Sequence, residues 1–482
     1  MAAAAARTTI RFLLGREPVE LVGFDPTRTV LDWLREDVGR RGTKEGCAEG
    51  DCGACTVVLG RLRYGALRYE AVNACILFLP MLDGCQLLTV EDLRAPDGAL
   101  HPVQQALVTH HGSQCGFCTP GFVMSLFAHM HEPNRMPVDD VLAGNLCRCT
   151  GYGPIVRAVN DLGRADPDPD VADRLAAFDD GRPFALEHAG WRFLAPRTVE
   201  GLAEALFADP DATVLAGATD VGVWVTKQLR RLDSVVWLGR IDDLARIEED
   251  EGAIRIGAGA TWRDALPVLG RLWPDFGEVL RRFGGVQVRN AATVGGNVAN
   301  GSPIGDSMPC LIALGAEVLL RRGRERRRLP LEELYLAYGV QAREPGEFVE
   351  GVVVPKPEAG DLFRAYKISK RFDQDISAVC AALRLRFDKD VVADARLAFG
   401  GMAPTPKRAA TAEAALIGRR WDEEAAQTAA TALADDFSPI DDMRASGGYR
   451  LAVARNLLRR AALDSAAPAG PTRLVGVGAL DV

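Results

Sequence analysis

The chain has 482 residues, 48% of them hydrophobic and 25% charged, an ordinary composition for a globular protein of about three or four domains. Its formal net charge of −8 at pH 7 argues against nucleic acid as a partner. The most apolar stretch, at 74–82, is far shorter than the roughly 20 residues of a membrane span. We therefore expect a protein that binds neither nucleic acid nor a membrane.

The first 92 residues, 1–92, predict a β-grasp ferredoxin domain. Apolar and polar residues alternate at 8–14 and 17–22 as in a hairpin, and a helical pattern covers 29–38. Three more strands are predicted, at 56–62, 67–71 and 87–90. Strands wrapped around one helix, with a cysteine-rich loop between them, are typical of this fold.

That loop carries three cysteines at an informative spacing. Cys47 is followed by Cys52 and Cys55, and Cys75 comes twenty residues after the third. This is the plant-type [2Fe-2S] spacing with a later fourth ligand. Structural zinc sites favour paired C-x2-C knuckles instead. We therefore predict that these four cysteines hold one [2Fe-2S] cluster.

Residues 93–164 predict a helical domain with a second set of four cysteines. Short helices are expected at 103–111, 121–131, 138–143 and 154–162. Cys115 and Cys118 precede the second helix, and Cys147 and Cys149 lie between the last two. Helix ends that converge would bring the four sulfurs together, with backbone N–H groups stabilising the anionic thiolates. A second [2Fe-2S] cluster is the favoured interpretation, although this set alone also fits a zinc knuckle.

Disulfide bonds are the alternative for these cysteines. The total of 11 is odd, and the N-terminus lacks the basic and long apolar regions of a secretory signal peptide. Iron–sulfur clusters suggest assembly in a reducing compartment, so we expect a cytoplasmic protein. The remaining cysteines, Cys85, Cys310 and Cys380, are singletons without a defined role, and buried free thiols are common.

From residue 165 onward the sequence pattern changes. Alternating Asp and Pro at 165–170 argues against a helix or a central strand, so 165–188 is predicted to be a linker with one helical turn near 174–178. An α/β domain is expected at 189–377, and a C-terminal domain of two strands and three helices at 378–466. The last residues, 467–482, are rich in Ala, Gly and Pro and are expected to form a loose tail.

Two glycine-rich segments of the α/β domain predict a further cofactor. Glycine lets the backbone approach a phosphate closely, and consecutive N–H groups form an anion nest. Each segment alone is also consistent with a tight turn. Together, beside two clusters, they favour a flavin, which exchanges two electrons for single ones. The candidate contacts, with Asp306 expected to accept ribityl or ribose hydroxyls, are Leu215, Ala216, Gly217, Ala218, Thr219, Asp220, Gly222, Thr293, Gly295, Gly296, Asn297, Ser302 and Asp306.

Eight motifs spread over residues 40–450 connect the chain to a known family. They are CAEGDCGAC from Cys47, VNAC from Val72, QCGFCTPGF from Gln114, NLCRCTGY from Asn145, LAGATD from Leu215, QVRNAATVGGNVANGSPIGD from Gln287, YKISKRFDQDIS from Tyr366 and IDDMRASGGYR from Ile440. With these motifs the chain resembles the small iron–sulfur and FAD-binding subunits of bacterial xanthine dehydrogenases. These belong to the molybdenum hydroxylase (xanthine oxidase) family.

The resemblance implies an α+β multidomain fold. Its parts would be a β-grasp [2Fe-2S] ferredoxin domain, a helical-bundle [2Fe-2S] domain, an FAD domain of the vanillyl-alcohol-oxidase type and a C-terminal α+β flavoprotein domain. The helical-domain cluster would lie nearer a molybdenum centre, and Gln114 would approach the pterin of a molybdopterin cofactor on a larger partner subunit. The segments 215–222 and 293–306 would contact the FAD pyrophosphate and ribityl chain, and Lys367 and Asp375 would lie near the flavin ring.

The activity implied is electron transfer from molybdenum through two clusters to FAD and on to NAD, in the oxidation of hypoxanthine and xanthine to urate. Two heterodimers would pair as a heterotetramer. NAD rests on the resemblance, because a dinucleotide fingerprint beginning at Gly257 fails at its third glycine position, Trp262, and O2 stays open as the acceptor. The alternatives are the same role in a hydroxylase of an aldehyde, nicotinate or another heterocycle, and a ferredoxin-like scaffold without turnover of its own.

Overall fold

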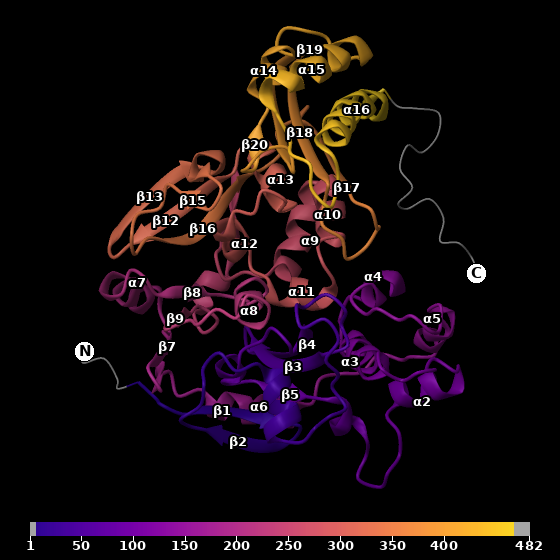
Figure 1. Ribbon diagram of the computed structural model, residues 1–482, viewed down its shortest axis with the longest axis vertical. Helices are drawn as coiled ribbons and strands as arrows, with labels where there is room; N and C mark the ends of the chain where they lie inside the picture. The colour runs from indigo at the N-terminus through magenta and orange to yellow at the C-terminus, as the bar shows by residue number, and fades with distance from the viewer. Residues whose placement is uncertain (1–5, 467–482) are drawn as a thin grey trace.

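The structure is a computed structural model that describes residues 6–466, so the predicted tail at 467–482 lies outside the described residues. The two N-terminal domains lie at one end of an elongated molecule, the α/β domain lies in the middle, and the C-terminal domain lies at the other end (Figure 1). The helices and strands combine as an α+β multidomain protein, which confirms the predicted fold class.

The β-grasp domain forms as predicted. Its five-stranded sheet has the order β2-β1-β5-β3-β4, and β1 and β5 run parallel. Thr29 begins the helix because its hydroxyl accepts a hydrogen bond from the Asp32 N–H at 3.0 Å. Four buried side chains of the helix, from Val30 to Leu34, join the core beneath the sheet. The elements are β1 (Ile10–Leu14), β2 (Glu17–Leu21), α1 (Val30–Asp32), the π-helical η1 (Trp33–Asp37), β3 (Thr56–Arg63), β4 (Ala66–Asn73) and β5 (Gln86–Leu88).

The helical domain is centred on α3, in which every residue from 121 to 130 is buried. Pro120 lies in its first turn, where a missing N–H leaves no intrahelical bond unmade. This helix packs against both β3 and β4, so the two N-terminal domains share a core. The helices are α2 (Pro102–Thr109), α3 (Thr119–Met130), α4 (Val138–Leu142) and α5 (Gly153–Asn160).

The predicted linker at 165–188 is more ordered than expected. It contains the ten-residue helix α6 (Pro169–Phe178) and ends in strand β6 (Phe184–His188). Asp168 caps the helix by accepting a hydrogen bond from the Asp170 N–H at 3.1 Å, and Pro169 occupies its first position. The Asp-Pro alternation therefore starts a helix instead of breaking one. Val171 and Leu175 bury that helix against the N-terminal core.

The α/β domain contains two sheets that differ in topology. The first has the order β6-β7-β9-β8, with β9 parallel to both neighbours, and the second has the antiparallel order β10-β11-β16-β12-β13. The first part is built from β7 (Trp191–Ala195), α7 (Val199–Ala208), β8 (Thr213–Leu215), α8 (Val221–Thr226) and β9 (Ser234–Trp237). The second is built from β10 (Ile247–Glu249), β11 (Ala253–Gly257), α9 (Trp262–Leu272), α10 (Pro274–Arg281), α11 (Val286–Ala291), α12 (Val294–Asn300), α13 (Ser307–Ala313), β12 (Glu317–Arg322), β13 (Glu325–Pro330) and β16 (Phe348–Pro355).

The C-terminal domain begins earlier than the predicted residue 378. Strand β17 pairs with β18 along its whole length, from Leu362 opposite Leu385 to Ile368 opposite Val379. The predicted boundary therefore falls just before the second strand of one sheet, because the loop 369–376 separates the first strand, β17, from β18. The elements are β17 (Leu362–Ile368), β18 (Val379–Asp388), β19 (Val391–Gly400), β20 (Lys407–Arg408), α14 (Ala410–Ala414), α15 (Glu423–Asp436) and α16 (Gly447–Ser465).

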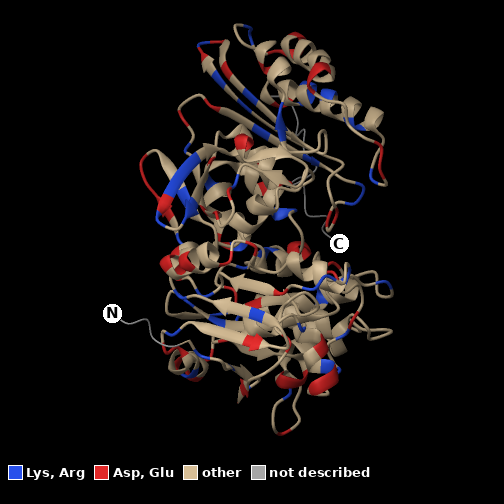
Figure 2. Cartoon of the chain, turned by 60° about the vertical axis from the view of Figure 1, so that its left-hand side comes forward, with Lys and Arg blue, Asp and Glu red and all other residues tan. Residues whose placement is uncertain are grey.

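Basic and acidic residues are interspersed over the molecule, and the arginine-rich hairpin of β12 and β13 is the clearest basic band (Figure 2). Its arginines are neutralised locally. Arg321 and Arg326 both contact Glu350, at 3.3 and 2.9 Å, and Arg327 contacts Glu347 at 2.7 Å. No helix within 6–466 has the length and apolar character needed to cross a membrane.

Asp83, in the turn before β5, joins separate segments through buried charges. Its carboxylate is 3% exposed and accepts hydrogen bonds from Arg7 at 2.8 Å and from Arg240 at 2.9 Å. Arg240 follows β9, so this contact links the β-grasp domain to the α/β domain. The carboxylate balances two guanidinium groups that have little access to water, and without it each would keep only its more exposed partner, Asp180 for Arg7 and Asp179 for Arg240.

We therefore expect Asp83→Ala to lower the free energy of unfolding by about 3–5 kcal/mol. The matched control is Asp243→Ala, because Asp243 pairs with Arg246 at 2.9 Å while both side chains are more than half exposed. Such a surface pair contributes about 1 kcal/mol or less. The shift of the urea unfolding midpoint measures both. Equal shifts in the two variants would contradict the stabilising role of Asp83.

Candidate functional site

Three cysteines of the first set lie in the loop 46–55, which connects the helix of the β-grasp domain to β3, and the fourth, Cys75, follows β4. Gly53 adopts φ of 71°, a left-handed backbone that favours glycine. The tight turn directs the N–H groups of Asp51 and Cys52 at the Cys47 sulfur, each at 3.3 Å, and the Cys47 N–H at the Cys52 sulfur at 3.3 Å. Hydrogen bonds of this kind stabilise negative charge on sulfur.

The four thiols of this set lie within hydrogen-bonding reach of one another. The pKa of the Cys47 thiol is lowered because it accepts hydrogen bonds from the thiols of Cys52 and Cys75. The pKa of the Cys55 thiol is lowered by its hydrogen bond with Cys75, which follows β4. The structure thus brings all four predicted ligands together, and the donor set fits a [2Fe-2S] cluster.

The second set is assembled from two pairs at the helix ends. Cys118 immediately precedes α3, and burial together with its hydrogen bond to the Cys147 thiol raises its pKa to about 12. The pKa of the Cys149 thiol is raised because it donates a hydrogen bond to Cys115. All four predicted ligands again converge, and this set also fits a [2Fe-2S] cluster.

The two sets differ in exposure. Cys55 and Cys75 are buried, whereas Cys115 and Cys149 are exposed. The predicted pterin contact, Gln114, is exposed as well. Beside the second set, Phe117 exposes 48% of its surface and Leu146 exposes 40%. The second set therefore lies at a partly apolar surface, while the first, with Cys55 and Cys75 buried and Cys47 and Cys52 half-buried, is the more enclosed of the two.

The first glycine-rich segment forms a turn with free backbone donors. It leaves β8 after Leu215, and Ala218 adopts φ of 63°. Among the described residues, no hydrogen bond engages the N–H groups of Gly217, Ala218 and Thr219. Consecutive donors around a left-handed residue form a nest that suits an anion such as a pyrophosphate. Gly222 has another role, because a Cβ there would lie 2.4 Å from the Ile76 carbonyl oxygen of the β-grasp domain.

The second segment is not the extended glycine-rich loop predicted at 293–306. Residues Val294–Asn300 form α12, which Thr293 begins by accepting a hydrogen bond from the Gly296 N–H at 3.0 Å. The Gly295 N–H donates to the Ala258 carbonyl at 3.0 Å, so these donors are already used within the protein. Gly296 remains exposed, and a Cβ on it would lie 3.6 Å from the Ala216 Cβ. The two segments therefore meet at Gly296.

Asp306 is engaged by protein side chains instead of standing open to a hydroxyl. It is 6% exposed, its Oδ2 forms an ion pair with Lys367, and its Oδ1 accepts a hydrogen bond from Ser377. Asn297 and Ser302 also have internal contacts, with the Ser307 hydroxyl and the Ile304 N–H. The side chains of Asp306, Asn297 and Ser302 thus hold the conformation of the segment through hydrogen bonds to other protein groups.

Asp375 lies in the loop 369–376 between β17 and β18. Its carboxylate accepts a hydrogen bond from the Arg371 N–H at 2.8 Å. Partial burial opposes ionisation, but that hydrogen bond and the charge of Arg371 prevail and lower the pKa of Asp375. The charges of Arg371 and Asp375 also act on the carboxyl of Asp51, so this loop reaches the first cysteine set.

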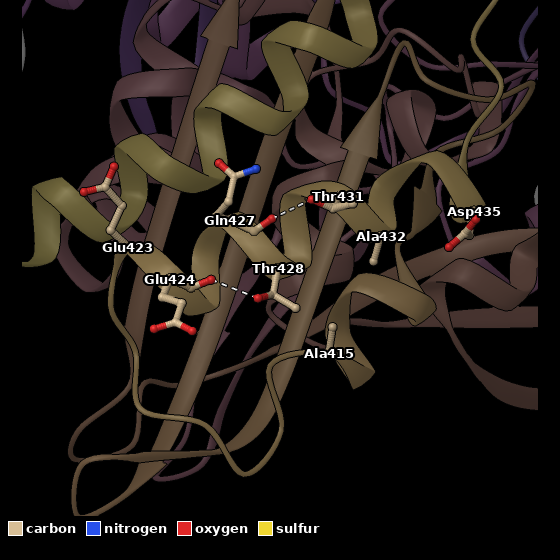
Figure 3. Close-up of a pocket in the computed structure, with 8 residues that line it drawn as sticks. All are labelled: Ala415, Glu423, Glu424, Gln427, Thr428, Thr431, Ala432 and Asp435. Atoms are coloured by element: carbon tan, nitrogen blue, oxygen red, sulfur yellow. Dashed lines mark hydrogen bonds between the residues drawn. The ribbon is translucent and has the colours of Figure 1, made fainter.

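Two cavities of the described residues are lined by none of the predicted cofactor residues. One of about 790 Å3 lies over α15 and the end of α14, with an acidic and threonine-rich lining (Figure 3). The other, of about 350 Å3, is lined by charged residues that include Arg321 and Glu350. Neither contains a predicted site residue.

Four buried polar residues at the domain boundaries were missed by the sequence analysis. Thr56, Ser125, Asn145 and Gln287 make hydrogen bonds with one another across three domains. Asn145 and Gln287 each begin one of the motifs that carry the family resemblance. Their position at the start of a motif is the one signal that pointed to them.

The chain has two converging thiol sets and, after them, the turn of free N–H groups at 217–219, which meets α12 at Gly296. This combination defines an iron–sulfur flavoprotein with two clusters. Four family models match consecutive parts of the chain. They are a 2Fe-2S iron-sulfur cluster binding domain at 14–79, a [2Fe-2S] binding domain at 89–160, the FAD binding domain in molybdopterin dehydrogenase at 187–357 and the CO dehydrogenase flavoprotein C-terminal domain at 364–465. The chain belongs to the molybdenum hydroxylase family and carries its two [2Fe-2S] domains and its FAD domain.

Curated relatives extend over nearly the whole chain. Xanthine dehydrogenase of Emericella nidulans is 32% identical over 89% of this chain and 36% of its own length, and that of Drosophila subobscura is 30% identical over 95% and 39%. Nicotinate hydroxylase hnxS of Emericella nidulans is 30% identical over 89% and 38%. The chain therefore spans less than two fifths of the length of these relatives.

Solved structures match somewhat more than half of the chain. Carbon monoxide dehydrogenase from Hydrogenophaga pseudoflava, in a form that lacks the Mo-pyranopterin moiety of its molybdenum cofactor, is 29% identical with a TM-score of 0.54, covering 57% of this chain and 96% of that chain. Quinoline 2-oxidoreductase from Pseudomonas putida 86 is 25% identical with a TM-score of 0.52, covering 56% and 95%. This chain is thus similar in fold to both proteins over that share of its length.

Because Gly296 is exposed where the two flavin segments meet, we expect Gly296→Val to abolish FAD binding and leave iron content unchanged. A side chain there would contact Thr293 Oγ1 at 2.8 Å and occupy the space beside Ala216. The matched control is Gly448→Val, in the first turn of α16, where a Cβ meets nothing within 4 Å. Flavin absorbance and iron analysis of the purified proteins measure the effect. Full FAD content in Gly296→Val would exclude this surface as the flavin site.

Proposed function

We propose that this chain is the electron-transfer subunit of a xanthine dehydrogenase. In this role it carries electrons from a molybdenum centre on a larger, molybdopterin-binding partner subunit through two [2Fe-2S] clusters to FAD and then to NAD, as hypoxanthine and xanthine are oxidised to urate. The observation that carries the proposal is that one chain holds two convergent thiol sets, one enclosed and one exposed, next to a flavin domain.

We assign the two clusters to the two cysteine sets. Cys47, Cys52, Cys55 and Cys75 hold the enclosed cluster, and Cys115, Cys118, Cys147 and Cys149 hold the exposed one. An electron donor on another subunit needs access to one end of the relay. The exposed set, with Phe117 and Leu146 on its apolar surface and Gln114 next to Cys115, is therefore the docking face for the molybdenum subunit.

We assign FAD to the surface between the segments 215–222 and 293–306. The free N–H groups around Ala218 support a pyrophosphate there. The Asp306–Lys367 pair fixes the strand β17 next to the second segment, and Asp375 orients the neighbouring loop. Bound FAD supplies the exchange between two-electron and one-electron chemistry. We expect no covalent link, since neither segment contains His or Cys.

Further parts of the proposal rest on the family alone. The relatives named xanthine dehydrogenase support NAD as the acceptor, and we propose a cytoplasmic heterotetramer of two heterodimers. The similarity to nicotinate hydroxylase hnxS favours a second candidate, in which the same relay serves hydroxylation of nicotinate, an aldehyde or another heterocycle. Identifying the partner subunit separates the two candidates, because the substrate binds there.

The loaded chain should contain four irons and four acid-labile sulfides. Cys55→Ser should remove the enclosed cluster and leave the spectroscopic signal of the other, because Cys55 belongs to one set. Cys85→Ser serves as the matched control, since Cys85 is a buried cysteine of the same domain outside both sets. Iron analysis and electron paramagnetic resonance measure the result. About two irons in the unmodified protein, or zinc alone, would refute the two-cluster assignment.

The isolated loaded chain should reduce an artificial dye with NADH but should not oxidise xanthine. Plant-type clusters near roughly −400 mV are close enough to the nicotinamide couple for electrons to run in either direction. Complexed with its partner, the protein should turn over xanthine in an NAD-dependent manner. A dye assay and steady-state kinetics with and without NAD test this. Equal turnover without NAD, with consumption of oxygen, would make the complex an oxidase. A chain that binds no FAD would instead be a scaffold.

A further inference from the structure

Three domains meet around the side chain of Gln287. This residue lies in the first turn of α11 and is 1% exposed. Its Nε2 lies 3.2 Å from Thr56 Oγ1 of the β-grasp domain, 3.0 Å from Ser125 Oγ and 3.0 Å from Asn145 Oδ1 of the helical domain. We refer to these four buried residues as the polar junction. In Figure 1, α11 lies at the boundary between the N-terminal domains and the rest of the molecule.

The polar junction is continuous with both cysteine loops. Thr56 directly follows Cys55, and Asn145 lies two residues before Cys147. Asn145 Nδ2 donates a hydrogen bond to the Gly53 carbonyl at 3.0 Å. The next residue, Leu146, donates its N–H to the Cys52 carbonyl at 2.9 Å. The backbone of a ligand of the first set is thus hydrogen-bonded to the residue before a ligand of the second.

The domains touch backbone to backbone around the polar junction. A Cβ on Gly53 would lie 2.1 Å from the Gly144 carbonyl oxygen, and a Cβ on Gly144 would lie 1.9 Å from Gln287 Oε1. A Cβ on Gly285 would lie 2.7 Å from the Gly144 Cα. The main chains of the three domains therefore approach one another closely around the side chains of the polar junction.

The helix that carries Gln287 also reaches the flavin segments. Its last residue, Ala291, has a carbonyl oxygen 1.7 Å from the position that a Cβ on Gly217 would occupy. Two residues further on, Thr293 begins α12. One short helix therefore contacts both cysteine loops at its start and both flavin segments at its end.

The polar junction contains a feature that stability alone does not explain. Gln287 Oε1 is buried, and no hydrogen-bond partner for it exists among the described residues. An unpaired buried amide oxygen is unfavourable, and an apolar side chain of the same length would avoid that loss. What the amide provides, and an apolar residue does not, is directional contact with two domains at once.

We infer that Gln287 is a positioning residue that sets the separation of the two cluster loops, and thereby the rate at which an electron leaves one cluster and enters the other. The inference rests on the proposed function, because it assumes that both loops bind clusters. Electron transfer through protein falls steeply with distance, and a hydrogen-bonded contact transmits it better than a gap. The Cys52 carbonyl to Leu146 N–H bond is the contact that Gln287 holds in place.

The test compares three variants of the loaded full-length chain. Gln287→Met keeps the length of the side chain and removes its hydrogen bonds, and Ser125→Ala removes one partner and perturbs folding less. Gln105→Met is the matched control, since Gln105 is exposed on α2 and contacts Thr109 of its own helix. The readouts are iron and FAD content, the midpoint potential of each cluster, their magnetic interaction, and the rate of electron transfer between them after rapid partial reduction.

We expect Gln287→Met to retain four irons and FAD, to weaken the magnetic interaction and to slow inter-cluster electron transfer by at least about tenfold, the scale on which small misplacements act. Ser125→Ala should show a smaller slowing, and Gln105→Met none. The midpoint potentials should stay unchanged, because no ligand is altered. A fully loaded Gln287→Met with the transfer rate and magnetic interaction of the unmodified protein would overturn the inference.

Two further outcomes have to be distinguished: a Gln287→Met variant that does not fold, and an unmodified chain that binds no clusters. If Gln287→Met does not fold, an unchanged rate in Ser125→Ala overturns the inference and leaves Gln287 a role in stability alone. If the unmodified chain binds no clusters, the proposed function fails. Hydrogen–deuterium exchange of the Leu146 amide then still tests the polar junction, because faster exchange is expected in Gln287→Met and Ser125→Ala but not in Gln105→Met. Unchanged exchange would overturn the positioning role independently of any cluster.

Discussion

The hydrogen bond from the Leu146 N–H to the Cys52 carbonyl joins the loop that carries three cysteines of the first set to the loop that carries Cys147 and Cys149 of the second. It forms because glycine occupies the positions where the loops approach, and a single Cβ on Gly53 would collide with the backbone of the opposite loop. Asn145 adds a polar contact at this boundary through its hydrogen bond to the Gly53 carbonyl. The main-chain contact and the apolar core shared by the first two domains together set their relative position.

The flavin domain also makes close contacts between main-chain groups. Gly222 leaves room for the Ile76 carbonyl just after Cys75, and Gly217 leaves room for α11. Asp83 adds a buried ionic link through Arg240. One large hydrophobic cluster spans the β-grasp and helical domains, and another spans the β-grasp domain and the strands β6, β7 and β9. Several glycines of the cofactor motifs thus serve close domain packing, and in a relay close packing keeps neighbouring redox sites near each other.

Much of this organisation could be predicted from sequence because it is local. Cysteine spacing, alternating strands and the capped helices lie within short windows, and both thiol sets converge as their spacing predicted. The errors arose where a local pattern has two meanings. Asp168-Pro169 caps a helix, though alternating Asp and Pro suggested a break, and Thr293 starts α12 where glycines suggested a loop. The partners of Asp306 and Gln287 are far away in sequence, so no window contained them.

The difference in exposure between the two cysteine sets supports the proposed direction of electron flow. A redox site that receives electrons from another protein has to lie near a surface, whereas a site that passes them inward is best shielded from solvent and from unwanted acceptors. The exposed cysteines Cys115 and Cys149 and the enclosed Cys55 and Cys75 follow this rule. The charges of Arg371 and Asp375 in the loop 369–376 act on Asp51 of the first cysteine loop. The exposure of the two sets supports the proposed order, from the exposed set to the enclosed set and on to the flavin domain.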